Sequence, residues 1–178
     1  VAFNYEFDQT KRVRISYNGS SNQPTANQLQ DVRDSTNLLN IRVGNPHLKP
    51  EFNHSMNFNY NVFNRQNSRS MFATLRATTS QNRIINSSTI KSGVSEIMPV
   101  NSNGFYNLSG NLSFGLPIKP KVLTLNLATN SGYSYATSFQ NGQKNISRSL
   151  SAGQTVTLNL NLKDKLDLSA NGNVTMVK

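Results

Sequence analysis

The sequence contains no cysteine and has few charged residues. The absence of cysteine excludes disulfide bonds, cysteine-based metal sites and a thiol nucleophile. Only 15% of the 178 residues are charged, against roughly 25% in soluble domains, and asparagine, serine, threonine and glutamine supply most of the polarity. Uncharged polar side chains suit a surface that is hydrated but carries no strong electrostatic field, such as the lumen of a large β-barrel.

Long hydrophobic runs are also missing. No apolar segment approaches the ~20 residues that a membrane-spanning helix requires, and the first residues do not form a signal peptide. A helical membrane protein is therefore excluded, whereas a membrane barrel needs only alternation over about ten residues per strand. The net charge of +10 suggests nucleic acid, but the basic residues are spread along the chain without a recognised motif. We therefore expect no nucleic-acid partner.

Strict alternation of apolar and polar residues is the main pattern that is present. In a strand, this spacing sends successive side chains to opposite faces. The alternating segments are 3–7, 13–17, 56–62, 107–118, 123–127, 156–162 and 166–176. The pattern predicts an all-β chain of about eight strands, several of them long enough to cross an apolar band about 25 Å tall.

Two kinds of connection separate the predicted strands. Short turns are predicted at 8–10, 65–68, around Pro120 and at 163–165, and long loops at about 20–51, 86–103 and 137–146. Tight turns at one end and long loops at the other are typical of outer-membrane barrels, whose turns lie in the periplasm. Basic residues gather at the predicted turns, namely Lys11, Arg12, Arg65, Arg69, Lys119, Lys121, Lys163 and Lys165.

Cations and aromatic residues near the strand ends suggest contacts with lipid. Loop cations would face outwards, where lipopolysaccharide phosphates could pair with them or water alone could solvate them. These cations are Arg33, Arg42, Lys49, Lys144 and Arg148. Candidates for the aromatic girdles at the two membrane interfaces are Tyr5, Phe7, Phe63, Tyr133 and Tyr135.

One segment carries a family resemblance. The first long loop ends in Gly44-Asn45-Pro46-His47-Leu48-Lys49-Pro50-Glu51, directly before the strand predicted over 52–64. This segment resembles the G-N-P-x-L-K-P-E motif in the barrels of TonB-dependent receptors, especially those of the outer membrane protein beta-barrel family. Two prolines so close together hold the chain extended and withhold two backbone donors. We therefore interpret the motif as a rigid entry from the loop into the barrel rim, in preference to a ligand-binding segment.

The resemblance implies a transmembrane antiparallel β-barrel of about twenty-two strands in the outer membrane of a Gram-negative bacterium. Residues 1–178 would form one part of that barrel, without the N-terminal plug or the ends of the parent protein. Such receptors import a scarce nutrient, of the siderophore, glycan or peptide class, with energy from the TonB complex. The implied partners are outer-membrane lipid and lipopolysaccharide, the TonB complex through the plug, and, as an option, a surface lipoprotein.

Ligand contacts would come from the lumen face and from loop residues 20–45. The lumen candidates are Asn57, Asn59, Arg76, Asn107, Asn111 and Asn126. His47 and His54 lack the spacing and neighbours of a metal site, and Asp31 and Asp34, beside a helix expected over 26–32, lack further oxygen ligands for calcium. We expect no metal, no cofactor and, without a nucleophile elbow or phosphate loop, no enzymatic activity.

Two alternatives stay open from the sequence. A soluble secreted β-domain, acting as an adhesin or glycan-binding module, would alternate in the same way if one face of its sheet were wet. A small structural barrel without transport would have a similar number of strands. The membrane-barrel hypothesis requires the apolar rows to face lipid, so rows buried between two stacked layers would exclude it.

Overall fold

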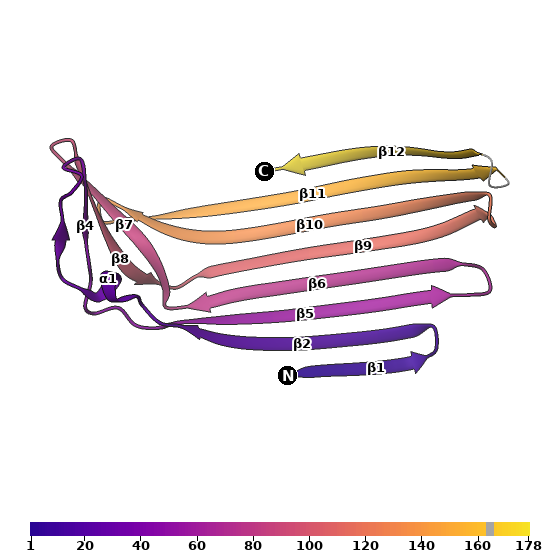
Figure 1. Cartoon of the computed structure of the whole chain (residues 1–178), viewed down its shortest axis with the longest axis horizontal. Coiled ribbons are helices and arrows are strands. Elements are labelled where there is room, and N and C mark those ends of the chain that lie inside the picture. Colours follow the sequence, from indigo (N-terminus) through magenta and orange to yellow (C-terminus); the bar gives the residue numbers. More distant parts are fainter. Residues whose placement is uncertain (163–165) are drawn as a thin grey trace.

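The computed structural model describes residues 1–162 and 166–178 and consists almost entirely of strands (Figure 1). Eight long strands form one antiparallel wall in this described part, each hydrogen-bonded to the next. In spatial order they are β1 (Ala2–Asp8), β2 (Lys11–Asn22), β5 (Glu51–Asn64), β6 (Arg69–Gln81), β9 (Phe105–Lys119), β10 (Leu123–Gln140), β11 (Gln143–Leu162) and β12 (Leu166–Val177). The wall has the eight strands counted from the sequence, although β6 lies outside the alternating segments.

Short turns join the wall strands at one end, which we call the turn end. They connect β1 to β2, β5 to β6, and β9 to β10, as predicted. Side chains close them locally: Asp8 Oδ1 accepts from the backbone N–H of Thr10 at 2.7 Å, and Asn64 Oδ1 accepts from that of Gln66 at 2.9 Å. The turn predicted at 163–165 lies outside the described residues.

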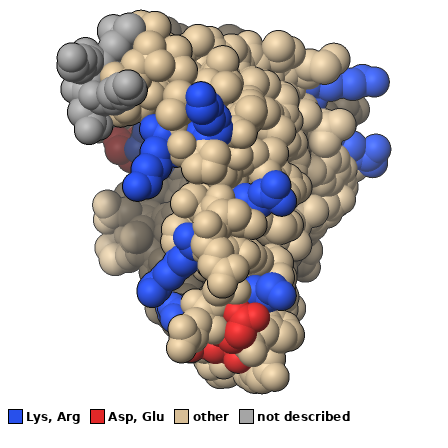
Figure 2. Space-filling view, turned by 90° about the vertical axis from the view of Figure 1, so that its right-hand side faces the viewer, with Lys and Arg blue, Asp and Glu red and all other residues tan. Residues whose placement is uncertain are grey.

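The turn end is rich in cations. Figure 2 views this end and shows Lys and Arg side chains spread across it, with an acidic group at one edge. Two of the cations are paired, Arg12 with Glu6 at 2.7 Å and Lys11 with Asp8 at 3.9 Å. The predicted gathering of basic residues at the short turns is confirmed for the residues that the structure describes, whereas Lys163 and Lys165 lie outside them.

Strand register gives the wall one apolar and one polar face. Tyr17, Met56, Ala77, Leu108 and Tyr133 are successive cross-strand partners on the apolar face. Among the described residues, the buried hydrophobic side chains are Ile41 and Leu48, and neither belongs to the wall. The apolar rows are therefore not enclosed between two layers, which is the arrangement that a lipid-facing surface requires.

The polar face is the hollowed one. One hollow is lined by the polar residues of β1, β2 and β5, and another by those of β9 to β12. Phe63 also lies on this face, because it lines a hollow with Asn61 and Arg65 and alternates with Val62 on the apolar side. The prediction that Phe63 belongs to an aromatic girdle is therefore wrong. Its residue type suggested the lipid face, whereas its position in the alternating pattern places it on the polar face.

Residues 23–50 and 82–104 lie together at the opposite end of the wall, the loop end, and we call this region the cap (Figure 1). Its elements are α1 (Ala26–Leu29), β3 (Arg33–Asp34), β4 (Asn40–Val43), β7 (Arg83–Lys91) and β8 (Val94–Ser102). β7 and β8 form a hairpin, β4 pairs with β8 in parallel, and β3 pairs with β4. The loop predicted at 86–103 is thus largely a hairpin.

Two further expectations at the loop end need correction. The helix expected over 26–32 is the single turn α1, closed by a capping box between Thr25 and Gln28. The prediction of a long loop at 137–146 is wrong, because β10 and β11 continue to a tight turn at Asn141 and Gly142, with φ of 51° and 74°. Asn-Gly favours this left-handed hairpin turn. The described part of the chain contains no helix long and apolar enough to cross a membrane.

Candidate ligand-binding surfaces

The predicted lumen residues all lie on the polar face of the wall. Asn57 on β5 is the cross-strand partner of Arg76 on β6, and Asn59 is the partner of Thr74. Thr74 is in turn the partner of Asn111 on β9. The register therefore brings Asn57, Asn59, Arg76 and Asn111 together over three adjacent strands.

Hydrogen bonds between side chains link part of this cluster. Thr74 Oγ1 donates to Asn59 Oδ1 at 3.3 Å, and Asn111 Nδ2 donates to Asn130 Oδ1 at 2.7 Å. Such pairs fix some amides but leave others available to a ligand, because each amide has two donors and an acceptor with two lone pairs. The result is a polar strip that crosses β5, β6, β9 and β10.

Two predicted residues lie away from this cluster. Asn107 pairs with Thr78 and Ser134, towards the loop end. Asn126 pairs with Gly115, which lies four residues after Asn111 on β9, towards the turn end. The six candidates thus share a face but do not form one compact site.

The arginines of β2 are absent from the lumen candidates predicted from the sequence. Arg14 is the cross-strand partner of Asn59, and Arg12 is the partner of Asn61. Both line an open hollow of about 700 Å³ on the polar face, together with Asn57 and Asn59. The signal was present in the sequence, because Arg12 and Arg14 alternate with Val13 and Ile15 and so must share the polar face.

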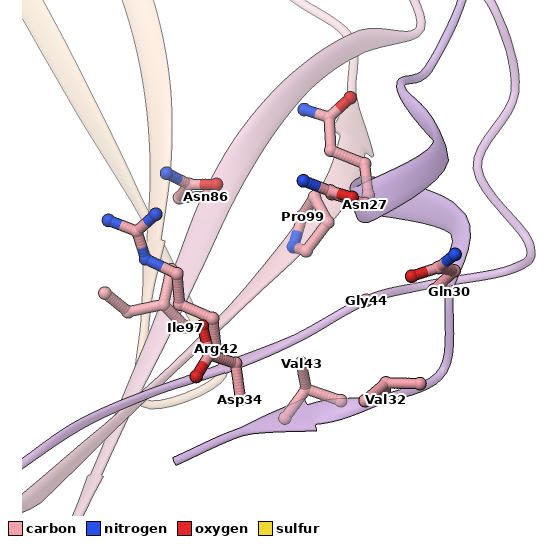
Figure 3. A pocket seen from close by; sticks show the side chains of 11 residues that line it. Asn27, Gln30, Val32, Asp34, Arg42, Val43, Gly44, Asn86, Ile97 and Pro99 are labelled. Atoms are coloured by element: carbon pink, nitrogen blue, oxygen red, sulfur yellow. The ribbon is translucent and has the colours of Figure 1, made fainter. Parts of the chain in front are cut away.

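A second cavity, of about 500 Å³, lies inside the cap (Figure 3). Figure 3 shows side chains from both cap segments around it. The lining residues are Asn27, Gln28, Gln30, Val32, Asp34, Arg42, Val43, Gly44, Asn86, Ile97 and Pro99. Eight of these eleven belong to loop residues 20–45, the loop region singled out from the sequence.

Unused polar groups distinguish the cap cavity. Arg33 forms an ion pair with Glu96 at 3.0 Å, but no ion pair or hydrogen bond within the described residues involves the side chains of Arg42, Gln30 or Asn86. Val43, Ile97 and Pro99 supply apolar surface beside them. Ligand pockets usually combine hydrogen-bond donors and acceptors that have no partner within the protein with neighbouring apolar surface.

Asp34 supplies a stable negative charge at the edge of this cavity. The hydroxyl and backbone N–H of Thr36 both donate to its Oδ1, at 2.6 and 3.0 Å. These hydrogen bonds, with a smaller contribution from the nearby Arg42 guanidinium, hold the pKa of the Asp34 carboxyl below its ordinary 3.8. The cavity therefore presents one anionic and one cationic group at neutral pH.

The Gly44–Glu51 motif holds the two cap segments together. Asn45 Nδ2 donates to the carbonyl of Pro99 at 3.0 Å, while Asn45 Oδ1 accepts from the backbone N–H of His47. Asn101 accepts from the backbone N–H of Lys49 at 2.8 Å and donates to the Lys49 carbonyl at 2.9 Å. These hydrogen bonds of uncharged groups hold the segment against β8, and we call this contact the clasp.

The remaining motif residues complete this clasp. Leu48 is one of the two buried hydrophobic residues in the described structure, and the Glu51 carboxylate accepts from the backbone N–H of Ile84 at 3.1 Å. A Cβ on Gly44 would stand 1.8 Å from the carbonyl oxygen of Gln30, so only glycine fits. β5 begins at Glu51, so the motif leads directly from the loop into the wall. His47 and His54 do not belong to any group of three or more potential metal-ligating side chains among the described residues.

The sequence profile of the outer membrane protein beta-barrel family matches residues 1–177. The chain belongs to this family. A search of curated proteins gave no match. Among solved structures, the chain is similar to the crystal structure of the siderophore receptor PirA from Pseudomonas aeruginosa, with a TM-score of 0.51 and 12% identity. The similarity covers 98% of this chain and 41% of the PirA chain, so the chain spans less than half of that receptor's length.

Family membership fixes the class and location of the protein. The wall is part of a transmembrane antiparallel β-barrel in the cell outer membrane, with the fold of a TonB-dependent receptor barrel. The soluble β-domain considered from the sequence is therefore excluded. In a barrel of this family, the apolar face of the wall meets lipid and the polar face meets the lumen.

Proposed function

We propose that this chain is part of the wall of a TonB-dependent receptor that imports a scarce nutrient across the outer membrane. The observation that carries the proposal is the cap cavity at the loop end of the wall, which is lined by Arg42, Gln30 and Asn86, whose side chains form no ion pair or hydrogen bond among the described residues. A cavity that combines such polar groups with apolar surface is suited to bind a ligand. We propose binding and transport without enzymatic chemistry.

The groups that line the cavity are compatible with the proposed nutrient classes. Amide and guanidinium groups bind hydroxyl, carbonyl and carboxylate oxygens, and Val43, Ile97 and Pro99 would contact the carbon skeleton. Siderophores, glycans and peptides all present such oxygens. The polar strip at Asn57, Asn59, Arg76 and Asn111 would provide a second set of contacts along the lumen.

Closure of the barrel requires further strands. β1 and β12 each pair with a single neighbour among the described residues, so each leaves one edge of backbone groups without a partner. Such edges are not tolerated in lipid. We propose that additional strands complete a barrel of about twenty-two strands, that a plug closes it and contacts the TonB complex, and that a surface lipoprotein is an optional partner.

Growth of a deletion strain tests the transport proposal. Cells that lack the gene would be supplied in turn with a ferric siderophore mixture under iron limitation, with soluble oligosaccharides, or with short peptides as the limiting source. We expect slower growth on one of the three, restored by the full-length gene but not when the TonB complex is inactivated. Equal growth of mutant and parent on all three sources would contradict the proposal.

Variants of the cap cavity test the site separately. The double variant Arg42→Ala/Asn86→Ala in the full-length protein should lower growth on the identified source while leaving the barrel assembled. Asn145→Ala, an exposed residue beside the β10–β11 turn, is the matched control. If uptake requires the gene but is unchanged in the double variant, transport stands and the cavity is not the binding site.

A further inference from the structure

The structure separates the five loop cations into two groups. Arg33 is paired with Glu96, Arg42 lines the cap cavity, and the backbone of Lys49 is held by Asn101. Lys144 and Arg148 instead lie on β11, where they alternate with Ser147 and Asn145 and share the face of Ile146 and Leu150. These two cations therefore stand on the lipid-facing side of the wall, close to its loop end.

An aromatic cluster lies beside the two cations. Arg148 is the cross-strand partner of Tyr135, with its Cζ atom 5.7 Å from the centre of the Tyr135 ring. Tyr106 stacks on Tyr135 at 4.8 Å, and Tyr133 lies 5.8 Å from Tyr106. Tyrosines gather where lipid headgroups meet the acyl region, so the cluster marks the level of the outer-leaflet headgroups.

Among the described residues, no carboxylate forms an ion pair with these two cations. The sequence from Phe105 to Leu162, which covers β9, β10 and β11, contains neither aspartate nor glutamate. The ion pairs among the described residues involve other cations. Placing two unpaired cations against lipid costs free energy unless an anion binds them at the membrane interface.

We propose that Lys144 and Arg148 bind a phosphate group of lipopolysaccharide in the outer leaflet. The guanidinium of Arg148 suits bidentate contact with phosphate, and the Lys144 ammonium adds a point charge. The acyl chains of the same lipid lie against Leu108 and Leu150, which are 43% and 53% exposed and flank Tyr133 in one cross-strand row. The partner is thus a phosphorylated lipid, and the proposal depends on the outer-membrane location but not on nutrient transport.

Lipid binding to the full-length protein, purified in mild detergent and stripped of lipid, tests this site. Native mass spectrometry would measure binding of bisphosphorylated lipid A to wild type and to Lys144→Gln/Arg148→Gln. We expect at least about a tenfold loss of affinity in the double variant, since each cation donates charge-assisted hydrogen bonds. Lys91→Gln, at an exposed cation of the cap hairpin, is the matched control and should bind like wild type.

Two further arms make the result specific. Dephosphorylated lipid A should bind the wild-type protein and the double variant with equal affinity. Inorganic phosphate should not displace the bisphosphorylated lipid from the wild-type protein. Arg148→Lys with Lys144 intact should restore part of the affinity, and all variants must keep heat-modifiable migration on a gel. Unchanged affinity in the folded double variant, or equal binding of dephosphorylated lipid, would overturn the proposal.

Discussion

The wall and the cap are stabilised in different ways, although they belong to one hydrogen-bonded sheet. The wall has long antiparallel ladders and no buried hydrophobic side chain among its described residues, so its apolar face depends on lipid. The cap contains both buried hydrophobic residues, Ile41 and Leu48, and is closed by side-chain hydrogen bonds to backbone groups. The membrane therefore stabilises the wall, whereas specific contacts between distant segments stabilise the cap.

A charge on the lipid face should produce the largest effect. Leu112→Arg places a guanidinium in the middle of β9 on the apolar side, which costs about 2–4 kcal/mol at the bilayer midplane. Ser113→Arg, one residue further on the polar face, is the matched control and should be nearly neutral. Heat-modifiable migration of the full-length protein from outer membranes measures assembly. Equal loss in both variants would show that the two faces are not lipid and lumen.

A methyl group at Gly44 should disrupt the cap without affecting the wall. Gly44→Ala forces its Cβ against the Gln30 carbonyl, and overpacking of this kind costs about 1–3 kcal/mol. Gly172→Ala on β12, where a Cβ meets no atom within 4 Å, is the control. We expect faster proteolysis within 23–50 in Gly44→Ala alone, with assembly unchanged. Loss of wall assembly in this variant would contradict the independence of the two regions.

Removing the Asn101 side chain should weaken the clasp by a smaller amount. Its amide contacts the backbone N–H and carbonyl of Lys49 and the carbonyl of Asn82 at 2.7 to 2.9 Å. Leaving such groups without partners costs about 1–3 kcal/mol. Hydrogen exchange at Lys49 should accelerate in Asn101→Ala and stay unchanged in Asn145→Ala. An unchanged rate in Asn101→Ala would mean that water replaces the amide without loss.

The smallest expected effect is a pH dependence of the β3 turn. The Thr36 hydrogen bonds lower the folded-state pKa of Asp34 below 3.8. The carboxylate therefore stabilises the turn above its unfolded pKa, and this contribution disappears as the pH falls through the lower folded value. Thr36→Ala should raise the pKa and move the loss to higher pH. Hydrogen exchange of residues 33–37, followed between pH 5 and 3 (about the ordinary carboxyl range), would measure the pH at which the turn loses protection in each protein. Identical pH profiles for wild type and Thr36→Ala would contradict the prediction.

The sequence was sufficient for the wall because the information there is local. Alternation predicts both the strands and their faces, since strand side chains point in opposite directions at every second residue. Arg14 and Phe63 also lie on the face that the alternation assigns to them. Their faces were not recognised because the prediction relied on residue type. The Asn141-Gly142 turn was also readable, as this dipeptide favours a tight hairpin.

The cap could not be predicted in the same way. Its β7–β8 hairpin turns at Ser92 and Gly93, with φ of 49° and 80°, in a segment that lacks regular alternation. The parallel pairings of β4 with β8 and of β10 with β7 join residues about fifty positions apart. Nothing local in the sequence specifies such partners.

The all-β class, the number of wall strands, their apolar and polar faces and, through the Gly44–Glu51 segment, the family can therefore be read from local sequence. The free cations, the position of the cap cavity and the need for glycine at position 44 become visible only in the folded chain. The physical reason is that face and turn type depend on neighbouring residues, whereas a cavity and its unpaired groups depend on how distant segments meet.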